Sequence, residues 1–291
     1  MIGELAERFR PPAWVLAWGK AVAERIGTST SRFRLGPDYI VIGGQRCGTT
    51  ALNRYLWDHP NVIPAMYKEI HFFDLNHRKG LGWYRGHFPT ARHQKRVASE
   101  RGGVALTGEA TPYYLFHPLV PERLLAAFPD VRLIAMLRDP VARAISHYHH
   151  ERALGIETLR LREALDAEDD RLAGEEARIL RDPTYTSHAH QHFSYKARGQ
   201  YAEQLQRWLG RFPRDQLLIV DAGSFFMDPG RALALVTSFL GLPTISRTSY
   251  EPHNAQEYGS DDAAITILRD HFRPHNRHLF DLIGTDLGWD R

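Results

Sequence analysis

Residues 38–56 of this chain constrain its fold most strongly, because they combine a buried strand, a glycine loop and the start of a helix. Residues 39–42 (YIVI) are β-branched or aromatic, which is typical of a buried strand, and Gly43 and Gly44 interrupt the run. Apolar residues within 51–56 then follow with the spacing of one helical face. A strand, a glycine loop and a helix N-terminus together present backbone N–H groups and the positive end of a helix dipole. This combination predicts a site for phosphate or sulfate.

The loop differs from the loop of nucleoside triphosphatases. Against the pattern GxxxxGK[ST], residues 43–50 read GGQRCGTT, so Thr49 stands where a lysine would reach the β- and γ-phosphates. Arg46 instead supplies a permanent cation inside the loop. For the loop alone, an ordinary strand-to-helix turn that uses glycine for its sharpness is the alternative.

The loop and a second segment together resemble the sulfotransferases that use 3′-phosphoadenosine 5′-phosphosulfate (PAPS). Residues 43–50 are similar to their 5′-phosphosulfate loop, and residues 132–148 (RLIAMLRDPVARAISHY) are similar to their 3′-phosphate motif. The resemblance covers roughly residues 38–245 and is strongest to the heparan sulfate 3-O- and N-sulfotransferase branch and its bacterial relatives. It implies PAPS as donor, adenosine 3′,5′-bisphosphate as product, and no metal.

The resemblance also assigns the residues that bind the donor. In the loop they are Arg46, Cys47, Gly48, Thr49 and Thr50.

In the second segment, Arg138 and Ser146 are expected to hold the 3′-phosphate with a guanidinium and a hydroxyl group. A capped junction of strand and helix with a surface arginine is the structural alternative.

Cys47 is the single cysteine of the chain, which rules out an internal disulfide. We expect a structural role for its thiol, because no general base can be assigned beside it.

Residues 59–74 (HPNVIPAMYKEIHFFD) are the predicted source of the catalytic base. Charged side chains stand here among apolar ones, where they are costly unless paired or used. The resemblance makes Glu69 the base that deprotonates the acceptor, while Arg46 stabilises the charge on the phosphosulfate. His71 is the second candidate for the base, and Asp74 completes the same pattern on the substrate side. An ion pair at Glu69 and a satisfied core histidine at His71 are the structural alternatives.

Two further segments are predicted to face the acceptor. GLGWYRGHF resembles a segment that lines the acceptor cleft in the same branch, where Trp83 and Tyr84 would stack on a sugar or ring. Packing in the core is the alternative for both. The three histidines of HAHQH alternate and would share one face of a strand, but no carboxylate or cysteine completes a zinc site. A polar acceptor-facing loop that includes His188 is therefore preferred over a metal site.

The chain departs from the family pattern at three places. Ala110 stands where the heparan sulfate enzymes have a lysine near the sulfuryl group, and Arg46 replaces the usual loop lysine. The arginine keeps its charge but does not yield a proton, so it would act electrostatically. The late loop with Lys-Gly-Arg that closes the family's nucleotide site is also not found, and residues 253–262 (HNAQEYGSDD) occupy its region.

Bulk composition limits the partners and the location. A net charge of +3 and a pI near 9.0 fit anionic ligands but are too weak to predict nucleic acid. No apolar stretch is long enough to span a bilayer, and no cleavage site is evident. Together with the single cysteine, this favours a cytoplasmic, bacterial-type protein. A homodimer is left open.

The alternation of buried strands and helices predicts one P-loop-like α/β domain over residues 1–291, with a mostly parallel central sheet flanked by helices. Residues 1–35 would form a helical extension, and residues 151–200 a helical and loop excursion on the acceptor side. Strands are predicted at 39–42, 104–109, 131–137 and 216–225, and helices from 49, 121, 140 and 228.

The predicted function is transfer of a sulfuryl group to a hydroxyl, with an amine as second choice. The acceptor would be a carbohydrate, a lipid or a secondary metabolite. A P-loop-type nucleotide kinase and a non-catalytic nucleotide-binding protein are the alternatives.

Overall fold

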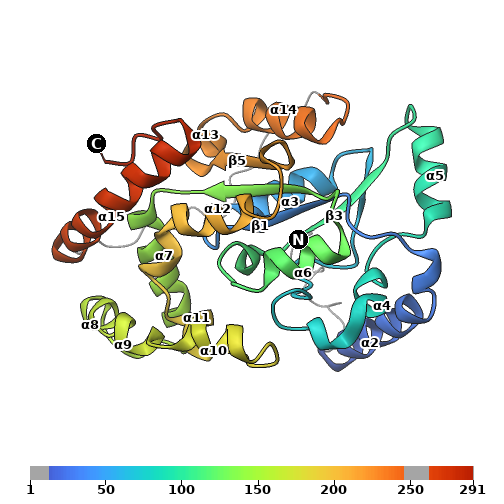
Figure 1. The fold of residues 1–291 in the computed structure, drawn as a ribbon. Coiled ribbons are helices and arrows are strands. Elements are labelled where there is room, and N and C mark those ends of the chain that lie inside the picture. Colours follow the sequence, from blue (N-terminus) through green and yellow to red (C-terminus); the bar gives the residue numbers. More distant parts are fainter. Residues whose placement is uncertain (1–12, 246–261, 291) are drawn as a thin grey trace, which may run out of the picture.

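A parallel sheet runs through the centre of the protein (Figure 1). The computed structural model describes residues 13–245 and 262–290. Within these residues the sheet has five strands in the order β2-β3-β1-β4-β5, and all of the pairings are parallel. The strands are β1 (Tyr39–Gly43), β2 (Val62–Pro64), β3 (Leu106–Ala110), β4 (Arg132–Leu137) and β5 (Leu217–Asp221). The predicted α/β fold with a central parallel sheet is therefore confirmed.

Helices connect and cover the strands. In chain order they are α2 (Ala13–Ser29), α3 (Thr49–Trp57), α4 (Gly80–Arg85), α5 (Ala91–Glu100), α6 (Val120–Ala127), α7 (Pro140–Ala153), α8 (Leu161–Asp166), α9 (Glu168–Leu172), α10 (Glu175–Arg181), α11 (His188–His192), α12 (Tyr201–Leu209), α13 (Ala222–Met227), α14 (Pro229–Leu240) and α15 (Asp262–Ile283). Short 3-10 helices lie at Ser31–Phe33, His77–Lys79, Pro112–Leu115 (η3), Ala197–Gly199 and Arg214–Gln216.

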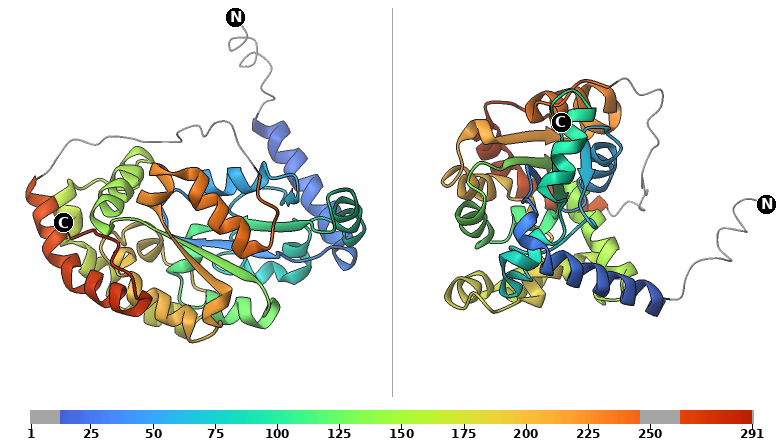
Figure 2. Two further views of the ribbon diagram at one scale, coloured as in Figure 1. Left: turned by 90° about the horizontal axis from the view of Figure 1, so that it is seen from above. Right: turned by 90° about the vertical axis from the view of Figure 1, so that its right-hand side faces the viewer.

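The alternation of side chains along β1 divides the core into two layers. Val41 points to one face, where it packs with Leu52 of α3 and Val236 of α14. Ile40 points to the other face, where it joins the cluster that contains Trp208 of α12. Because helices cover both faces, every residue of β1 is buried, as is typical of a parallel sheet (Figure 2).

The strand order places a crevice above the middle of the sheet. β1 lies between β3 and β4, and the chain runs to β2 and β3 on one side but to β4 and β5 on the other. Such a reversal leaves space at the carboxyl ends of the strands, where open α/β sheets bind ligands. α7 leaves β4 at this edge and packs with α8 and α15 in a third apolar cluster.

The end of one predicted strand and part of one predicted loop are helical, and in both a side chain caps the helix. The strand predicted at 216–225 ends at Asp221, because its Oδ2 accepts a hydrogen bond from the Ser224 N–H (2.7 Å) and starts α13. The Ser187 hydroxyl oxygen likewise accepts from the His190 N–H (3.0 Å) and starts α11. The three histidines therefore lie in a helical turn, neither on the strand face considered for a metal site nor in the predicted loop.

Gly108 permits the close approach of β3 to β1. It pairs with Tyr39, and a Cβ atom at this position would overlap the Tyr39 carbonyl oxygen and ring. We expect Gly108→Ala to lower the free energy of unfolding by about 1–3 kcal/mol or more, because backbone atoms of a central strand have to move. Urea-induced unfolding measures this change.

Gly19→Ala is the matched control for this substitution. Gly19 lies exposed on α2, and no atom lies within 4 Å of the position that an added methyl group would take. Alanine should therefore raise stability by up to about 1 kcal/mol through helix propensity. Equal effects of the two substitutions would contradict the packing argument.

Candidate active site

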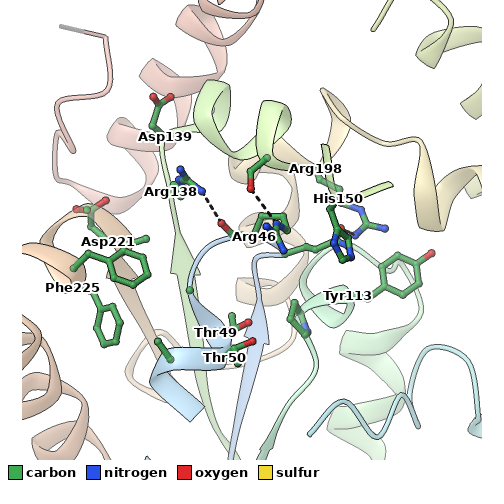
Figure 3. A pocket seen from close by; sticks show the side chains of 18 of the residues that line it. Arg46, Thr49, Thr50, Tyr113, Arg138, Asp139, His150, Arg198, Asp221 and Phe225 are labelled. Carbon is green, nitrogen blue, oxygen red and sulfur yellow. Dashed lines mark hydrogen bonds between the residues drawn. The ribbon is translucent and has the colours of Figure 1, made fainter. Parts of the chain in front are cut away.

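A cleft of about 1220 Å³ opens at the carboxyl edge of the sheet. Its lining comes from the carboxyl ends of four strands and the segments that follow them: Arg46 after β1, Tyr113 after β3, Arg138 after β4 and Asp221 at the end of β5. Figure 3 shows these side chains around the loop that follows β1. The crevice expected from the strand order is thus lined by charged side chains.

Unusual backbone conformations concentrate in this cleft. Among the described residues, the non-glycine residues with positive φ are Arg46 (66°), Glu69 (62°) and His71 (53°), and all three line the cleft. A left-handed conformation costs energy in residues with a Cβ atom and persists where the surrounding structure enforces it, often at functional sites. These three are the residues for which the sequence predicts catalytic roles.

Hydrogen bonds to the backbone shape the loop. The Gly44 N–H donates to the Met136 carbonyl of β4 (2.5 Å), and the Cys47 N–H donates to the Gly44 carbonyl (3.2 Å). Gly48 has φ 87°, and a Cβ atom there would overlap the ring of Phe226. The loop therefore turns tightly into α3 against the cleft wall formed by α13.

Arg46 joins the two predicted anion motifs. Its Nε donates to the Ser146 hydroxyl (3.1 Å), and its carbonyl oxygen accepts from Arg138 Nη1 (3.2 Å), as the dashed lines in Figure 3 show. Residues about a hundred positions apart in the sequence are therefore adjacent in one cleft. In this arrangement the Arg46 side chain is turned toward Ser146, which the resemblance assigns to the 3′-phosphate.

The other loop residues differ in what they present to the cleft. Thr49 and Thr50 line it at the first turn of α3, and Gly48 lines it through its backbone. The Cys47 side chain is fully buried and is not part of the lining. Its sulfur lies 3.7 Å from the Tyr201 hydroxyl, and burial raises the pKa of the thiol. A thiol in this position packs in the core.

Glu69, His71 and Asp74 form a chain of charged groups. His71 Nδ1 lies 2.7 Å from Asp74 Oδ2, and His71 Nε2 lies 3.7 Å from Glu69 Oε2. Lys68 forms an ion pair with the other oxygen of Glu69. Glu69 and His71 line the cleft, whereas the Asp74 carboxylate is buried behind them. The predicted contact of Asp74 with substrate is thus corrected, because its carboxylate bonds His71 and the Leu75 N–H.

The charges around Glu69 and His71 outweigh the effect of burial on their pKa values. Burial would raise the pKa of Glu69, but His71 and Lys68 hold it at about 2. Burial would lower the pKa of His71, but Asp74 and Glu69 raise it to about 10. At neutral pH Glu69 is a carboxylate and His71 is an imidazolium, so only Glu69 is in the form that accepts a proton.

The backbone of this segment is fixed by buried hydroxyl and amide groups. The Tyr114 hydroxyl oxygen accepts from the N–H groups of Phe72 (2.9 Å) and Phe73 (3.3 Å). The Asn76 side chain donates to the His71 carbonyl (2.9 Å), and the Glu69 N–H donates to the carbonyl of Ala110 at the end of β3. The central sheet thus holds Glu69 at the mouth of the loop.

Trp83, Tyr84 and His188 do not line the cleft. Tyr84 is fully buried and donates to the buried carboxyl of Glu109 (2.7 Å), so core packing describes it and the predicted contact with acceptor does not. Trp83 donates to Glu24 of α2 (3.3 Å) and is not part of the lining. His188 is exposed on α11 and packs against the rings of His192 and Phe193. These three sequence predictions are corrected.

Several residues of the lining were not predicted from the sequence. They are Gln45, Tyr113, His150, Gln191, His192, Arg198, Asp221, Phe226 and Trp289. The segment with Gln191 and Arg198 was predicted to face the acceptor, but no local pattern singled out the arginine.

Within residues 13–245 and 262–290, no group of three or more His, Cys, Asp or Glu side chains is placed to hold a metal ion. In the same residues, no helix combines the length and apolar character needed to cross a membrane. Most of segment 253–262, predicted to replace the family's cofactor-closing loop, lies outside the described residues.

A parallel sheet with a glycine loop after β1 and an arginine and a serine after β4 is typical of the P-loop-like class of α/β proteins. The family model described as "Sulfotransferase domain" matches residues 36–258. The chain belongs to the sulfotransferase family, as the sequence resemblance predicted.

Similar proteins agree with this assignment. The chain is 32% identical to heparan sulfate glucosamine 3-O-sulfotransferase 3B1 of Mus musculus, over 87% of the chain and 65% of that protein. It is 28% identical to the membrane-associated sulfotransferase kil1 of Dictyostelium discoideum, over 87% of the chain and 66% of that protein. It thus spans slightly less than two thirds of these relatives.

Among solved structures, a sulfotransferase from Alicyclobacillus acidocaldarius is 31% identical. The similarity covers 88% of this chain and 100% of that one, with a TM-score of 0.64.

The Asp74 carboxylate is expected to keep His71 protonated. In the parent protein His71 should titrate at a pKa of about 10, and in Asp74→Asn its pKa should fall toward the ordinary value near 6.5. Because the folded pKa is raised, this interaction stabilises the fold fully below pH 6.5 and is lost as the pH rises through about 10. NMR titration of the imidazole measures the shift.

Asp166→Asn serves as the control, because Asp166 is exposed and pairs with Arg162 away from the cleft. Its free energy of unfolding should track that of the parent at every pH, whereas the deficit of Asp74→Asn should shrink between pH 6.5 and 10. An unchanged His71 pKa in Asp74→Asn would refute the assigned cause.

Proposed function

We propose that this protein transfers a sulfuryl group from PAPS to a hydroxyl group, with an amine as the second choice of acceptor. The observation that carries the proposal is the pair of hydrogen bonds from Arg46 to Ser146 and from Arg138 to Arg46. They place the loop after β1 and the motif after β4 around one cleft, so one ligand with two separated anionic groups can contact both.

The residues of the cleft fit such a ligand. Arg46 and Arg138 are permanent cations, and Thr49, Thr50 and Ser146 supply hydroxyl donors at the edge of the sheet. The N-terminus of α3 adds the positive end of a helix dipole. Bound PAPS would supply an activated sulfuryl group whose S–O bond to the phosphate breaks as adenosine 3′,5′-bisphosphate leaves.

The charged chain beside the loop supplies the base. Glu69 accepts the proton of the acceptor hydroxyl as its oxygen attacks sulfur, and the imidazolium of His71 lies 3.7 Å from Glu69 Oε2 and orients the carboxylate. Asp74 in turn holds His71 by the bond to Nδ1. With a pKa of about 2, Glu69 is a weak base, so positioning and electrostatic stabilisation carry more of the catalysis than proton affinity does.

The acceptor is proposed to be a carbohydrate hydroxyl. The support is the similarity, at 30–32% identity, to proteins named heparan sulfate glucosamine 3-O-sulfotransferases. A lipid or a secondary metabolite remains the alternative acceptor. The expected cytoplasmic location and bacterial origin stay predictions from sequence.

Binding of the donor product tests the assignment of the nucleotide. Titration calorimetry should show that adenosine 3′,5′-bisphosphate binds at least about tenfold more tightly than ADP or ATP, because only the bisphosphate can occupy both anion motifs. Arg138→Ala should remove this preference. A preference for ATP, together with magnesium-dependent turnover, would instead support the nucleotide kinase.

The role of Glu69 is tested by turnover. Glu69→Gln keeps the size of the side chain but removes the base, so transfer of ³⁵S from PAPS to a desulfated heparan-type glycan should fall at least about 100-fold while bisphosphate binding is retained. Glu176→Gln is the control, because Glu176 is partly exposed and pairs with Arg207 outside the cleft. A Glu69→Gln protein with near-parental turnover would exclude Glu69 as the base.

A further inference from the structure

Arg198 is a buried arginine that opens onto the cleft. Only 4% of the residue is exposed, yet it belongs to the cleft lining. Its Nε donates to the Ser194 hydroxyl (2.8 Å), and its Nη2 donates to the carbonyls of His190 (3.1 Å) and Gln191 (2.6 Å). Its Nη1 donates to the side-chain oxygen of Gln45 in the anion loop. The guanidinium is therefore fixed in place by the loop, by α11 and by Ser194 just after α11.

The positive charge of Arg198 is not neutralised by these contacts. Each acceptor found for it in the described part of the chain is a neutral oxygen. The neighbouring carboxylates serve other groups: Glu151 pairs with His192, and Glu168 accepts from the N–H groups that follow Tyr195. Burial lowers the pKa of Arg198 to about 10, which leaves it a cation at neutral pH. Neutral acceptors compensate a buried cation less than a carboxylate does, so an anionic ligand would bind favourably beside it.

Aromatic rings set the direction of the guanidinium. It lies over the rings of Tyr113 (4.7 Å to the centroid) and Phe116 (5.2 Å). These rings belong to η3 and the residue that follows it, just after β3, whose last residue Ala110 is buried and carries no charge. Arg198 thus places a positive charge near the carboxyl end of β3, where the strand's own last residue is uncharged.

Arg198 and Arg138 lie on opposite sides of the anion loop. In Figure 3, Arg138 contacts Arg46 from one side, and Arg198 lies on the other side with His150 and Tyr113. Glu69 is anchored on this second side, because its N–H donates to the Ala110 carbonyl beside η3. A group held between the loop and Glu69 would therefore lie on the same side of the loop as Arg198.

We propose that Arg198 binds the sulfuryl group of the donor, on the side of the loop from which the acceptor attacks. This assignment rests on the proposed function and adds a binding residue to it. Four of its five N–H groups fix the guanidinium on the loop, on Ser194 and on two carbonyls, which leaves one Nη1–H and the positive charge for the ligand. Because the guanidinium is already held in place, little reorganisation is needed as negative charge develops on the sulfuryl oxygens. The bisphosphate product lacks that group and should not depend on Arg198.

A comparison of PAPS with adenosine 3′,5′-bisphosphate isolates this contact without any acceptor. By calorimetry, Arg198→Gln should weaken PAPS at least about tenfold while changing the affinity for the bisphosphate less than about threefold, as expected for loss of one charge-assisted contact. Arg198→Lys keeps the charge but not the planar fork, so its selective loss should be smaller, about threefold. Arg123→Gln is the matched control, because Arg123 also bonds backbone carbonyls but lies outside the cleft lining.

The possible results separate this inference from the proposed function. Equal weakening of both nucleotides, or of neither, in a folded Arg198→Gln protein overturns the inference and leaves the function intact. If Arg198→Gln does not fold, Arg198→Lys replaces it in the test. The quantity compared is again the affinity for PAPS divided by the affinity for the bisphosphate, and a value equal to that of the parent protein overturns the inference. A parent protein that binds neither nucleotide contradicts the function itself, and the inference with it.

Discussion

The tight turn after β1 is the constraint on which the rest of the site depends. The Gly44 N–H bonds to β4, Arg46 takes a left-handed conformation, and the Arg46 carbonyl then faces Arg138. This geometry turns the Arg46 side chain toward Ser146 of α7. The loop is thus tied to β4 and to the helix that follows it, and two distant sequence motifs become one surface.

Charge compensation explains how so many ionised groups coexist at this edge. Glu69 has two cationic neighbours, Lys68 and His71, and His71 is in turn held by the buried Asp74 carboxylate. Each group in this chain stabilises the charged state of the next one, which is why the pKa of His71 is raised even though burial opposes it. Arg198 differs, since its partners in the described structure are neutral. This contrast, together with its place in the cleft lining, is the basis for proposing that a ligand supplies its counter-charge.

Much of the fold follows from local sequence patterns. The buried runs at β1 and β4 and the helices that start after Gly48 and Asp139 were predicted from periodicity and glycine or capping signals, and the structure has them. β2 was not predicted, because three residues are too few for a period to be recognised. β5 was predicted too long, because the capping bond of the Asp221 side chain competes with a continuing strand.

The sequence by itself determined the family, the parallel α/β fold and the types of residue that meet an anion, because a strand, a glycine loop and a helix start are local features. Tertiary structure alone decided which side chains reach the cleft. Tyr84 turns to the buried Glu109 carboxyl, His71 becomes a cation through Asp74, and Arg198 is delivered from another segment by contacts with Gln45 and Tyr113. Burial, charge state and orientation depend on neighbours that packing brings from distant parts of the chain, and no local period encodes those neighbours.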